Sequence, residues 1–548
     1  MTNLKIPGFD LAYGKNTSMR IRSARIRNAT DLDRLNVDIP EMVFKTKGKV
    51  LEPFFDSESY SLPEDIQLTA MADGSMADFM TDLLLETSDG TVALNGTILE
   101  QGRYFVKSNL EIVELDLGKI LELPDLKPIS LVSSLDGKGT GLYDMEGLMK
   151  VDFSQLAWAD VDLSATELAL SAKDTVATLQ MGFAKEYLDF TLNSTVKIDT
   201  VYPELNFLMD VKRLNTKSIG ATKQEIDTSC HISGKRSGNP EGISAAIELS
   251  DGTFHLENRD FPIGLIKMDA TLSDILSDLK VQSDFLDGFF TVNSSLSNLT
   301  LALEDYFNQV IVGRSDSLFV GELVAESLFK FHPTPFIDQL LLADIDEMDT
   351  LLFEFGFNSS EQSIHSRVRM PHLLYLNANL DTFLLDLNGN ANTLNFDLGF
   401  NSLFYEPFNV GKTRMHADFK DQIVNFGFNS QYKEDTVINL MSEVTNLVDT
   451  IQVRFLTEDL IFNKENWDIP KDNLVTYSPK SLQFQNFVFS NGDQSLGLKN
   501  NLIEEGEDQL SIEFKNFILH SILGFLNPEN PLAEGIVNGN LTAVNPFD

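Results

Sequence analysis

Two stretches of alternating apolar and polar side chains between Thr393 and Asn429 constrain the fold more than any other feature of the sequence. Side chains point alternately to opposite faces of a β-strand, so each stretch has one apolar face and one polar face. A polar gap separates the two stretches. The apolar positions are Leu394, Phe396, Leu398 and Phe400, then Val424, Phe426 and Phe428. The pattern predicts two amphipathic strands, and it recurs along the whole chain.

Composition limits the classes of partner. Of the 548 residues 43% are hydrophobic, so the chain can bury a large apolar surface. Phenylalanine is the main aromatic residue, with 40 against 11 Tyr and 2 Trp, which favours apolar contact or ordinary core packing. The net charge of −40 disfavours nucleic acid and anionic lipid headgroups as partners, because both require a basic surface. A single cysteine, Cys230, excludes an intramolecular disulfide.

Most of the sequence predicts further strands, broken by a few short helical segments. The expected strands include 43–50, 66–70, 83–86, 92–97, 111–117, 129–135, 205–211, 299–303 and 510–514. Turns are expected at Gly74, Asp89-Gly90, Asp136-Gly137 and Asn538-Gly539. A single helical turn at 118–123 ends at Pro124, a helix is expected at 335–342 with Pro335 at its first position, and a third at 520–526.

The order of elements at 111–135 returns at 510–541, which predicts an internal repeat. No long segment rich in Pro, Gly or Ser divides the chain. We therefore expect an all-β protein in which residues 1–548 form one continuous, elongated body, because an uninterrupted array of similar strands is typical of a quasi-one-dimensional fold.

Catalytic motifs are missing from the sequence. The seven histidines do not lie at metal-ligand spacing, and no nucleotide-binding glycine pattern or nucleophile motif is present. The acidic cluster Asp344, Asp346, Glu347 and Asp349 lacks the glycine and glutamate of a calcium-binding EF-hand loop, and is interpreted as a solvated turn. The sequence thus predicts a protein that is not an enzyme, has no catalytic or metal-binding residues, and needs no cofactor.

Several short segments, taken in order, resemble a known family. They are 115–121 (Leu-Asp-Leu-Gly-Lys-Ile-Leu), 134–140 (Ser-Leu-Asp-Gly-Lys-Gly-Thr), 335–341 (Pro-Phe-Ile-Asp-Gln-Leu-Leu), 355–359 (Phe-Gly-Phe-Asn-Ser), 460–463, 467–473 (Trp-Asp-Ile-Pro-Lys-Asp-Asn) and 482–492. Together they resemble the central part of TamB proteins of the kind found in Bacteroidota, which are AsmA-like, bridge-type lipid-transfer proteins. Each segment alone is a weak signal, and the resemblance rests on their order over nearly the whole chain.

This resemblance implies a U-shaped sheet, or β-taco, whose apolar groove shields phospholipid acyl chains between the inner and outer membranes. It implies a periplasmic location in a Gram-negative bacterium, with the parent protein anchored in the inner membrane. In the family an N-terminal membrane helix and a C-terminal domain that meets a TamA/BamA-type outer-membrane barrel flank this body, and we expect the present chain to be a fragment without either.

Strand parity selects the residues expected to line the groove. They are Leu188, Phe190, Leu192, Val196 and Ile198; Phe353, Phe355 and Phe357; Leu394, Phe396, Leu398 and Phe400; Val424, Phe426 and Phe428; Ile451, Val453 and Phe455; and Leu510, Ile512 and Phe514. Each of them could equally be an ordinary core residue, because periodicity does not distinguish an open groove from a closed core.

Three functions that do not involve catalysis are compatible with this pattern. The first is a lipid conduit. The second is an assembly factor that helps outer-membrane or secreted β-proteins to insert, working with a TamA/BamA-type barrel, since a sheet edge can template strand addition. The third is a structural fibre, which should bind no lipid.

Overall fold

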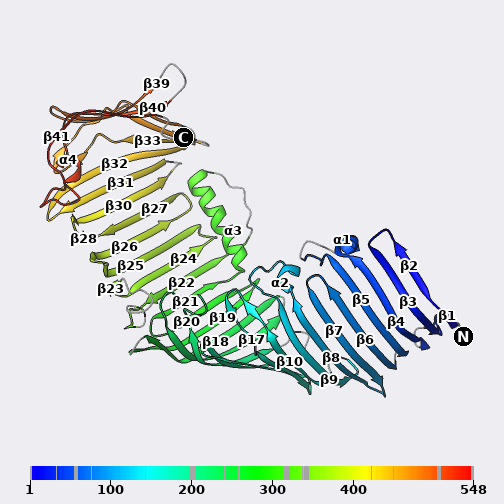
Figure 1. The fold of residues 1–548 in the computed structure, drawn as a ribbon. Helices are drawn as coiled ribbons and strands as arrows, with labels where there is room; N and C mark the ends of the chain where they lie inside the picture. The colour runs from blue at the N-terminus through cyan, green and yellow to red at the C-terminus, as the bar shows by residue number, and fades with distance from the viewer. Residues whose placement is uncertain are drawn as a thin grey trace. The chain divides into compact units, whose positions relative to one another are not determined.

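The computed structural model confirms the all-β fold class. Strands make up 69% of the protein and helices 7%, and a long antiparallel sheet of many strands is not closed into a barrel (Figure 1). The structure describes residues 3–31, 34–54, 60–75, 77–141, 144–197, 202, 204–239, 241–256, 259–313, 321–335, 337, 345–420, 423–447, 450–479, 481–502 and 508–544. Within these residues the long sheet has 35 strands, and a separate sheet of 4 strands lies near the C-terminus.

The chain divides into two compact units, residues 1–266 and 267–548. The division falls inside the strand Arg259–Ser273. Whether the chain acts as one continuous body stays a prediction.

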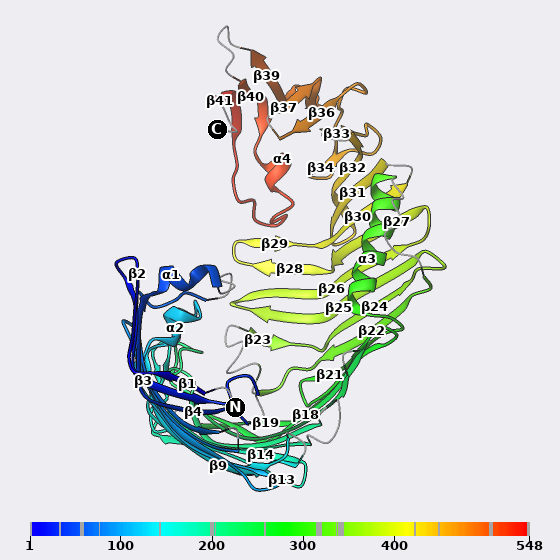
Figure 2. The ribbon, with the colours of Figure 1, turned by 90° about the vertical axis from the view of Figure 1, so that its right-hand side faces the viewer.

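Unit 1 is an antiparallel meander in which nearly every strand pairs with the next one along the chain (Figure 2). Its strands are β1 (Asn3–Ile6), β2 (Phe9–Tyr13), β3 (Thr17–Arg27), β4 (Asn36–Lys47), β5 (Asp65–Ser75), β6 (Asp78–Thr87), β7 (Gly90–Glu100), β8 (Tyr104–Leu115), β9 (Ile129–Gly139), β10 (Glu146–Gln155), β11 (Ala157–Trp158), β12 (Val161–Asp162), β13 (Glu167–Lys173), β14 (Val176–Lys185), β15 (Leu188–Lys197), β16 (Leu205–Asn215), β17 (Asp227–Asn239), β18 (Gly242–Leu256) and β19 (Arg259–Ser273), the last crossing into unit 2. β11 and β12 form their own two-stranded sheet, so β10 pairs with β13.

Two short helices of unit 1 lie at the same rim of its sheet in both ribbon views (Figures 1 and 2). They are α1 (Gly48–Leu51), continued by a 3-10 turn at Glu52–Phe54, and α2 (Leu117–Ile120). α2 confirms the helical turn expected before Pro124, and the carboxylate of Asp116 caps it by accepting a hydrogen bond from the Lys119 backbone N–H at 2.9 Å.

Unit 2 continues the antiparallel pattern. Its strands are β20 (Ser277–Gln282), β21 (Leu286–Val292), β22 (Val324–Phe331), β23 (Ile345–Met348), β24 (Leu351–Asn358), β25 (Ser363–Tyr375), β26 (Ala378–Gly389), β27 (Thr393–Phe400), β28 (Ser402–Tyr405), β29 (Phe408–Val410), β30 (Lys412–Lys420), β31 (Ile423–Tyr432), β32 (Asp435–Leu447), β33 (Thr450–Phe455), β34 (Ile461–Phe462), β35 (Glu465–Asn466), β36 (Leu474–Ser478), β37 (Ser481–Gln485), β38 (Phe487–Asn491), β39 (Gln494–Leu502), β40 (Asp508–Ile518) and β41 (Ile536–Val544). Its helices are α3 (Leu296–Phe307), extended by a π-helical turn at Asn308–Val312, and α4 (His520–Leu523).

The strand expected at 299–303 is wrong, because these residues lie in α3. The hydroxyl of Ser295 caps the helix by accepting from the Asn298 N–H at 3.2 Å. Leu299, Ala302 and Tyr306 then recur at helical spacing and are buried together. A period near 3.6 therefore prevails over the shared parity of the leucines.

Several expected boundaries are also wrong. Gly74, Asp136-Gly137 and Asn538-Gly539 lie within β5, β9 and β41 rather than in turns. The strand expected at 43–50 ends at Lys47, and Asp346 and Glu347 belong to β23 rather than to a turn. The helix expected at 335–342 falls mostly outside the described residues. In the part of the chain that is described, no helix is long and apolar enough to cross a membrane.

Candidate functional site

The residues expected to line a groove in the long sheet of unit 2 share one face of it. Paired positions on adjacent strands lie side by side on the same face, so the register identifies a cross-strand row. From β20 to β33 this row is Leu279, Phe290, Ser327, Phe355, Ser366, Leu387, Phe396, Ala417, Phe426, Ser442 and Phe455. The remaining expected residues of β24, β27, β31 and β33 have the same parity as the row members on their strands, so they lie on this face too.

Helix α3 covers part of this face. Phe357 and Leu394 are 3% exposed and pack with the buried face of α3, and Phe355 packs against the same cluster. The Tyr306 hydroxyl donates a hydrogen bond to the Asn390 carbonyl at 3.3 Å, and burial raises the pKa of Tyr306 to about 12. These expected lining residues therefore form core under the helix.

A second aromatic cluster covers the C-terminal strands of unit 2. It is centred on Trp467, which is 2% exposed, and Phe428, Phe455 and Phe514 pack against it. Ile451, by contrast, is 39% exposed. Leu510, Ile512 and Phe514 belong to β40 in the separate sheet β38–β41 and do not extend the row.

In unit 1, Leu188, Phe190 and Leu192 pack around Phe183 and Val211 at one end of β15. Val196 pairs with Ala177 and Leu205 at the other end. Ile198 lies outside the described residues.

Unit 1 also contains a longer apolar row, which crosses every strand of the meander from β3 to β18. Its only polar member is Ser133. The row is Ile21, Met42, Ala70, Leu83, Leu94, Leu110, Ser133, Val151, Leu168, Met181, Leu192, Met209, Ile232 and Leu249. Of these residues strand parity selects only Leu192 from the sequence, because apolar residues such as Met80, Leu84 and Phe105 also occur at the polar-face positions of β6 and β8.

The apolar face of β6, β7 and β8 is left uncovered except at the end next to α2, where Val92, Leu110 and Ile112 pack against the buried cluster around Leu115. In these three strands Leu115 is the only buried residue, and it lies at the end next to α2. Inward-facing residues such as Leu83 and Leu94 keep part of their surface open to solvent, while Asp82, Leu84 and Asn95 on the polar face are exposed. Monomeric proteins seldom leave a contiguous apolar face open unless it binds something.

This face deepens into an apolar hollow of about 780 Å³ at the ends of β6–β10 and β13 that lie opposite α2. Phe79, Ile98 and Val106 form one wall, and Leu135, Met149 and Leu170 line it towards the middle of the strands. Gly137 on β9 and Gly147 on β10 are register partners, and neither contributes a side chain to the hollow. The volume is in the range of sites for small organic ligands.

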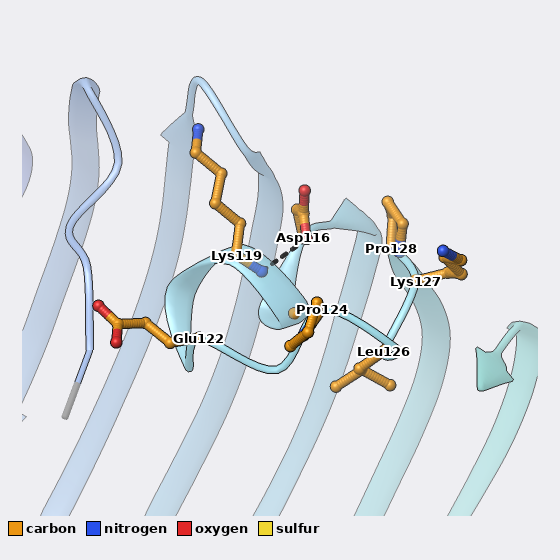
Figure 3. Close-up of a pocket in the computed structure, with 8 residues that line it drawn as sticks. Asp116, Lys119, Glu122, Pro124, Leu126, Lys127 and Pro128 are labelled. Carbon is orange, nitrogen blue, oxygen red and sulfur yellow. Dashed lines mark hydrogen bonds between the residues drawn. The ribbon is translucent and has the colours of Figure 1, made fainter. Parts of the chain in front are cut away.

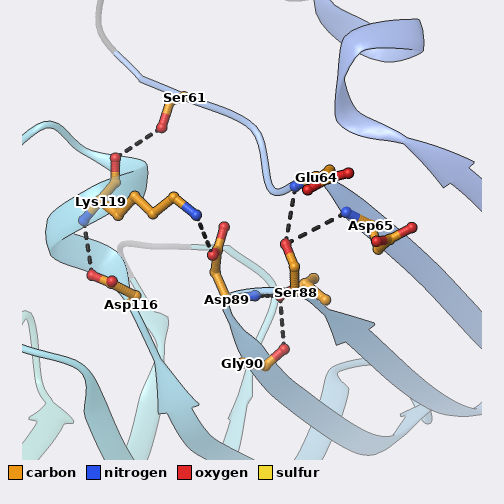
Figure 4. A network of polar contacts seen from close by, with 9 residues as sticks. Ser61, Glu64, Asp65, Ser88, Asp89, Gly90, Asp116 and Lys119 are labelled. Atoms are coloured by element: carbon orange, nitrogen blue, oxygen red, sulfur yellow. Dashed lines mark hydrogen bonds and ion pairs between the residues drawn. The ribbon is translucent and has the colours of Figure 1, made fainter.

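The opposite rim is closed by polar contacts. The hydroxyl of Ser61 donates to the Lys119 carbonyl at 2.8 Å, and the Lys119 ammonium pairs with Asp89 (Figure 4). The hydrogen bond that the Lys119 ammonium donates to the Asp89 carboxylate raises the pKa of Lys119. The Ser88 hydroxyl accepts from the Glu64 N–H at 3.0 Å. These bonds attach the segment that follows α1 to the rim at α2.

A second hollow of about 490 Å³ lies beside α2, lined by Asp116, Lys119, Glu122 and Pro128 among others (Figure 3). Asp116 already caps the helix and Lys119 is already paired, so both are engaged in holding the rim. We assign this hollow a structural role.

The polar face of the same strands carries cross-strand ion pairs, including Lys107–Asp136 at 3.1 Å and Lys138–Glu146 at 3.0 Å. The pair with Lys138 lowers the pKa of Glu146. Exposed pairs of this kind add little stability, but they mark this face as the one in water.

Among the described residues, no group of three or more His, Cys, Asp or Glu side chains is placed to hold a metal ion. Comparisons with protein-family models, with characterised proteins and with solved structures gave no match. The functional argument therefore rests on the geometry of the apolar face.

Proposed function

We propose that this chain is part of a bridge-like protein that shields phospholipid acyl chains on an apolar groove as lipids move between two membranes. The observation that carries the proposal is the uncovered apolar face of β6–β8, which belongs to a row running from β3 to β18. Burial of each lipid methylene contributes about 0.8 kcal/mol, so an acyl chain laid on this face is held without any polar contact. The headgroup stays in water, because burying an unpaired charge is costly.

The resemblance noted above supplies the cellular setting of this proposal. The protein would act in the periplasm of a Gram-negative bacterium, carried by a parent anchored in the inner membrane and meeting a TamA/BamA-type barrel at the outer membrane. Because adjacent strands present similar apolar side chains, a lipid could pass from one strand to the next without leaving apolar surroundings.

An assembly factor for β-proteins is the second candidate function, and one feature favours it. Among the described residues, β41 pairs only with β40, so its other edge is open, and Leu541 is 63% exposed. An incoming strand could add to this edge. The uncovered face of β6–β8 does not favour this function, because those strands are paired on both sides and offer no free backbone groups.

The test is native mass spectrometry with lipid extraction on the purified chain, comparing two pairs of substitutions. Leu83→Asp with Leu94→Asp places charge on the apolar face. Leu84→Asp on β6 with Val132→Asp on β9, at residues 37% and 53% exposed on the polar face of the same sheet, is the control. We expect phospholipid to co-purify with the wild type and the control, and to be lost from the first pair.

A chain that carries no phospholipid when purified from a Gram-negative host would refute the conduit. Binding of an unfolded outer-membrane β-protein that survives Leu83→Asp with Leu94→Asp, together with absence of lipid, would favour the assembly factor. Phe396→Asp with Phe426→Asp is the corresponding pair in unit 2, where both side chains lie in the apolar row.

A further inference from the structure

The hollow at the ends of β6–β10 and β13 differs from the rest of the apolar face because its central positions carry almost no side chains. Gly137 and Gly147 face each other across β9 and β10, and Ala172 pairs with Gly147 on β13. Larger side chains continue the same cross-strand line on the other side, where Val106 pairs with Gly137. The result is a trough of about 780 Å³ that runs across the strands.

The dimensions of this trough fit one acyl chain. From β6 to β13 there are five strand spacings of about 4.8 Å each, so the trough is about 24 Å long. The chains of one bilayer leaflet span about half of a hydrocarbon core of about 30 Å, or about 15 Å. An acyl chain can therefore lie along the trough with most of its length covered.

The charged groups at the rim are already paired. Asp144 accepts hydrogen bonds from the Thr140 N–H at 2.7 Å and the Gly141 N–H at 2.8 Å, and Glu146 pairs with Lys138. These contacts are made within the β9–β10 hairpin itself, and the walls that face the trough are apolar. The chemistry fits an aliphatic chain better than a polar or charged ligand.

A polypeptide is a poor occupant of this site. The strands beneath the trough are hydrogen-bonded to neighbours on both sides. A peptide laid across them would find no backbone partners for its own N–H and C=O groups and would leave them unsatisfied. An aliphatic chain has no such groups to satisfy.

We propose that this trough is a preferred binding site for one lipid acyl chain, a fixed station on an otherwise uniform apolar face. The proposal rests on the proposed function and makes it more specific. Lipids would pause here, and their distribution along the face would be uneven.

Filling the trough is the direct test. A Cβ added at Gly137 meets only ordinary contacts, the Glu146 carbonyl at 3.6 Å and the Gly147 Cα at 3.9 Å, so Gly137→Leu is compatible with the strand. The control is Gly182→Leu on β14, which has the opposite parity to the buried Phe183 and has no atom within 4 Å of an added Cβ. Each methylene displaced from the trough weakens binding about fourfold, so loss of two or three methylene contacts predicts at least a tenfold effect.

The probe is a phosphatidylethanolamine with a photoreactive diazirine at the end of one acyl chain, and crosslinked peptides are counted by mass spectrometry. We expect crosslinks to concentrate on the trough walls, to fall at least about tenfold in Gly137→Leu, and to persist in Gly182→Leu. Leu170→Asp, at a residue 40% exposed in the trough wall, gives a second variant that should fold even if Gly137→Leu does not.

Three outcomes are distinguishable. Crosslinks lost from the trough but retained in unit 2 would support the station. Crosslinks spread evenly over the apolar face and unaffected by Gly137→Leu and Leu170→Asp would overturn the station and leave the conduit standing. Crosslinks absent from the whole apolar face would overturn both.

Discussion

Replacing Leu94 by Asp should destabilise unit 1 much less than replacing Leu131 by Asp, although both leucines lie on the same apolar face. Leu94 is partly open to solvent, whereas Leu131 is 8% exposed and packs in the cluster beside α2. Leu94→Asp loses the burial of one leucine, at most about 3 kcal/mol, and its carboxylate can reach water. Leu131→Asp loses the same burial and also traps a charge, so we expect more than about 4 kcal/mol.

Urea unfolding at pH 7, followed by far-UV circular dichroism, measures both differences in the free energy of unfolding. Hydrogen exchange of peptides from β7 and β9 shows whether the loss is local. Near pH 3 the two variants should differ less in their free energy of unfolding. The buried carboxyl of Leu131→Asp becomes neutral there, whereas the carboxyl of Leu94→Asp is hydrated at both pH values. Equal penalties at pH 7 would show that the face over β7 is dry, and would remove the main support for a conduit.

Three further outcomes are expected. Ser295→Ala removes the N-cap of α3 and should lower the free energy of unfolding of unit 2 by about 1 kcal/mol, measured by urea unfolding. Ser295→Asp can still cap the helix and should keep most of that stability. The hydrogen bond from Lys185 lowers the pKa of Asp162 to about 2, so its stabilising effect is complete above the unfolded pKa near 3.9 and is lost as pH falls towards 2. Asp162→Asn should therefore lower the melting temperature at pH 7 and make no difference near pH 1.5; an unchanged gap at both pH values would contradict this assignment. Burial raises the pKa of Tyr306 to about 12, so its stabilising effect is lost as pH rises from about 10 to about 12. Absorbance at 295 nm should show the same number of tyrosines ionising near pH 10 in the wild type and in Tyr306→Phe. It should show one further tyrosine ionising near pH 12 in the wild type only.

The strands could be predicted from the sequence because their signal is local. Alternation along 393–400 and 423–432 places Phe396 and Phe426 on one face without reference to any other part of the chain, and both lie on strands with that parity. Hairpin dipeptides were less reliable. Asp89 does lie in the turn between β6 and β7, with Gly90 as the first residue of β7, but Asp136-Gly137 lies inside β9, where Gly137 contributes to a trough.

Helix α3 was missed because its leucines also fit a strand. Leu299, Leu301 and Leu303 have one parity, yet Ser295 as an N-cap and Tyr306 on the same face as Leu299 and Ala302 fit a helix better. The N-cap residue Ser295, read together with this helical spacing, predicts the helix. The helix determines which residues of β24 and β27 are covered, so this local error extends to the site: Phe357 and Leu394 were expected in a groove and are packed beneath α3.

Segments distant in sequence determine whether an apolar face is covered, and the local periodicity of a strand does not predict which segments pack on it. Phe428 and Leu94 have the same alternating context. The ring of Phe428 packs edge-on against Phe525 with 6.2 Å between ring centroids, an interaction that only the return of the chain after β40 makes possible. Leu94 belongs to a strand in which no residue is buried. An open apolar face therefore depends on which parts of the sheet no later segment packs against. The candidate site lies on β6–β10 and β13 of unit 1, and the residues with the most regular phenylalanine pattern, 393–429, are not part of it.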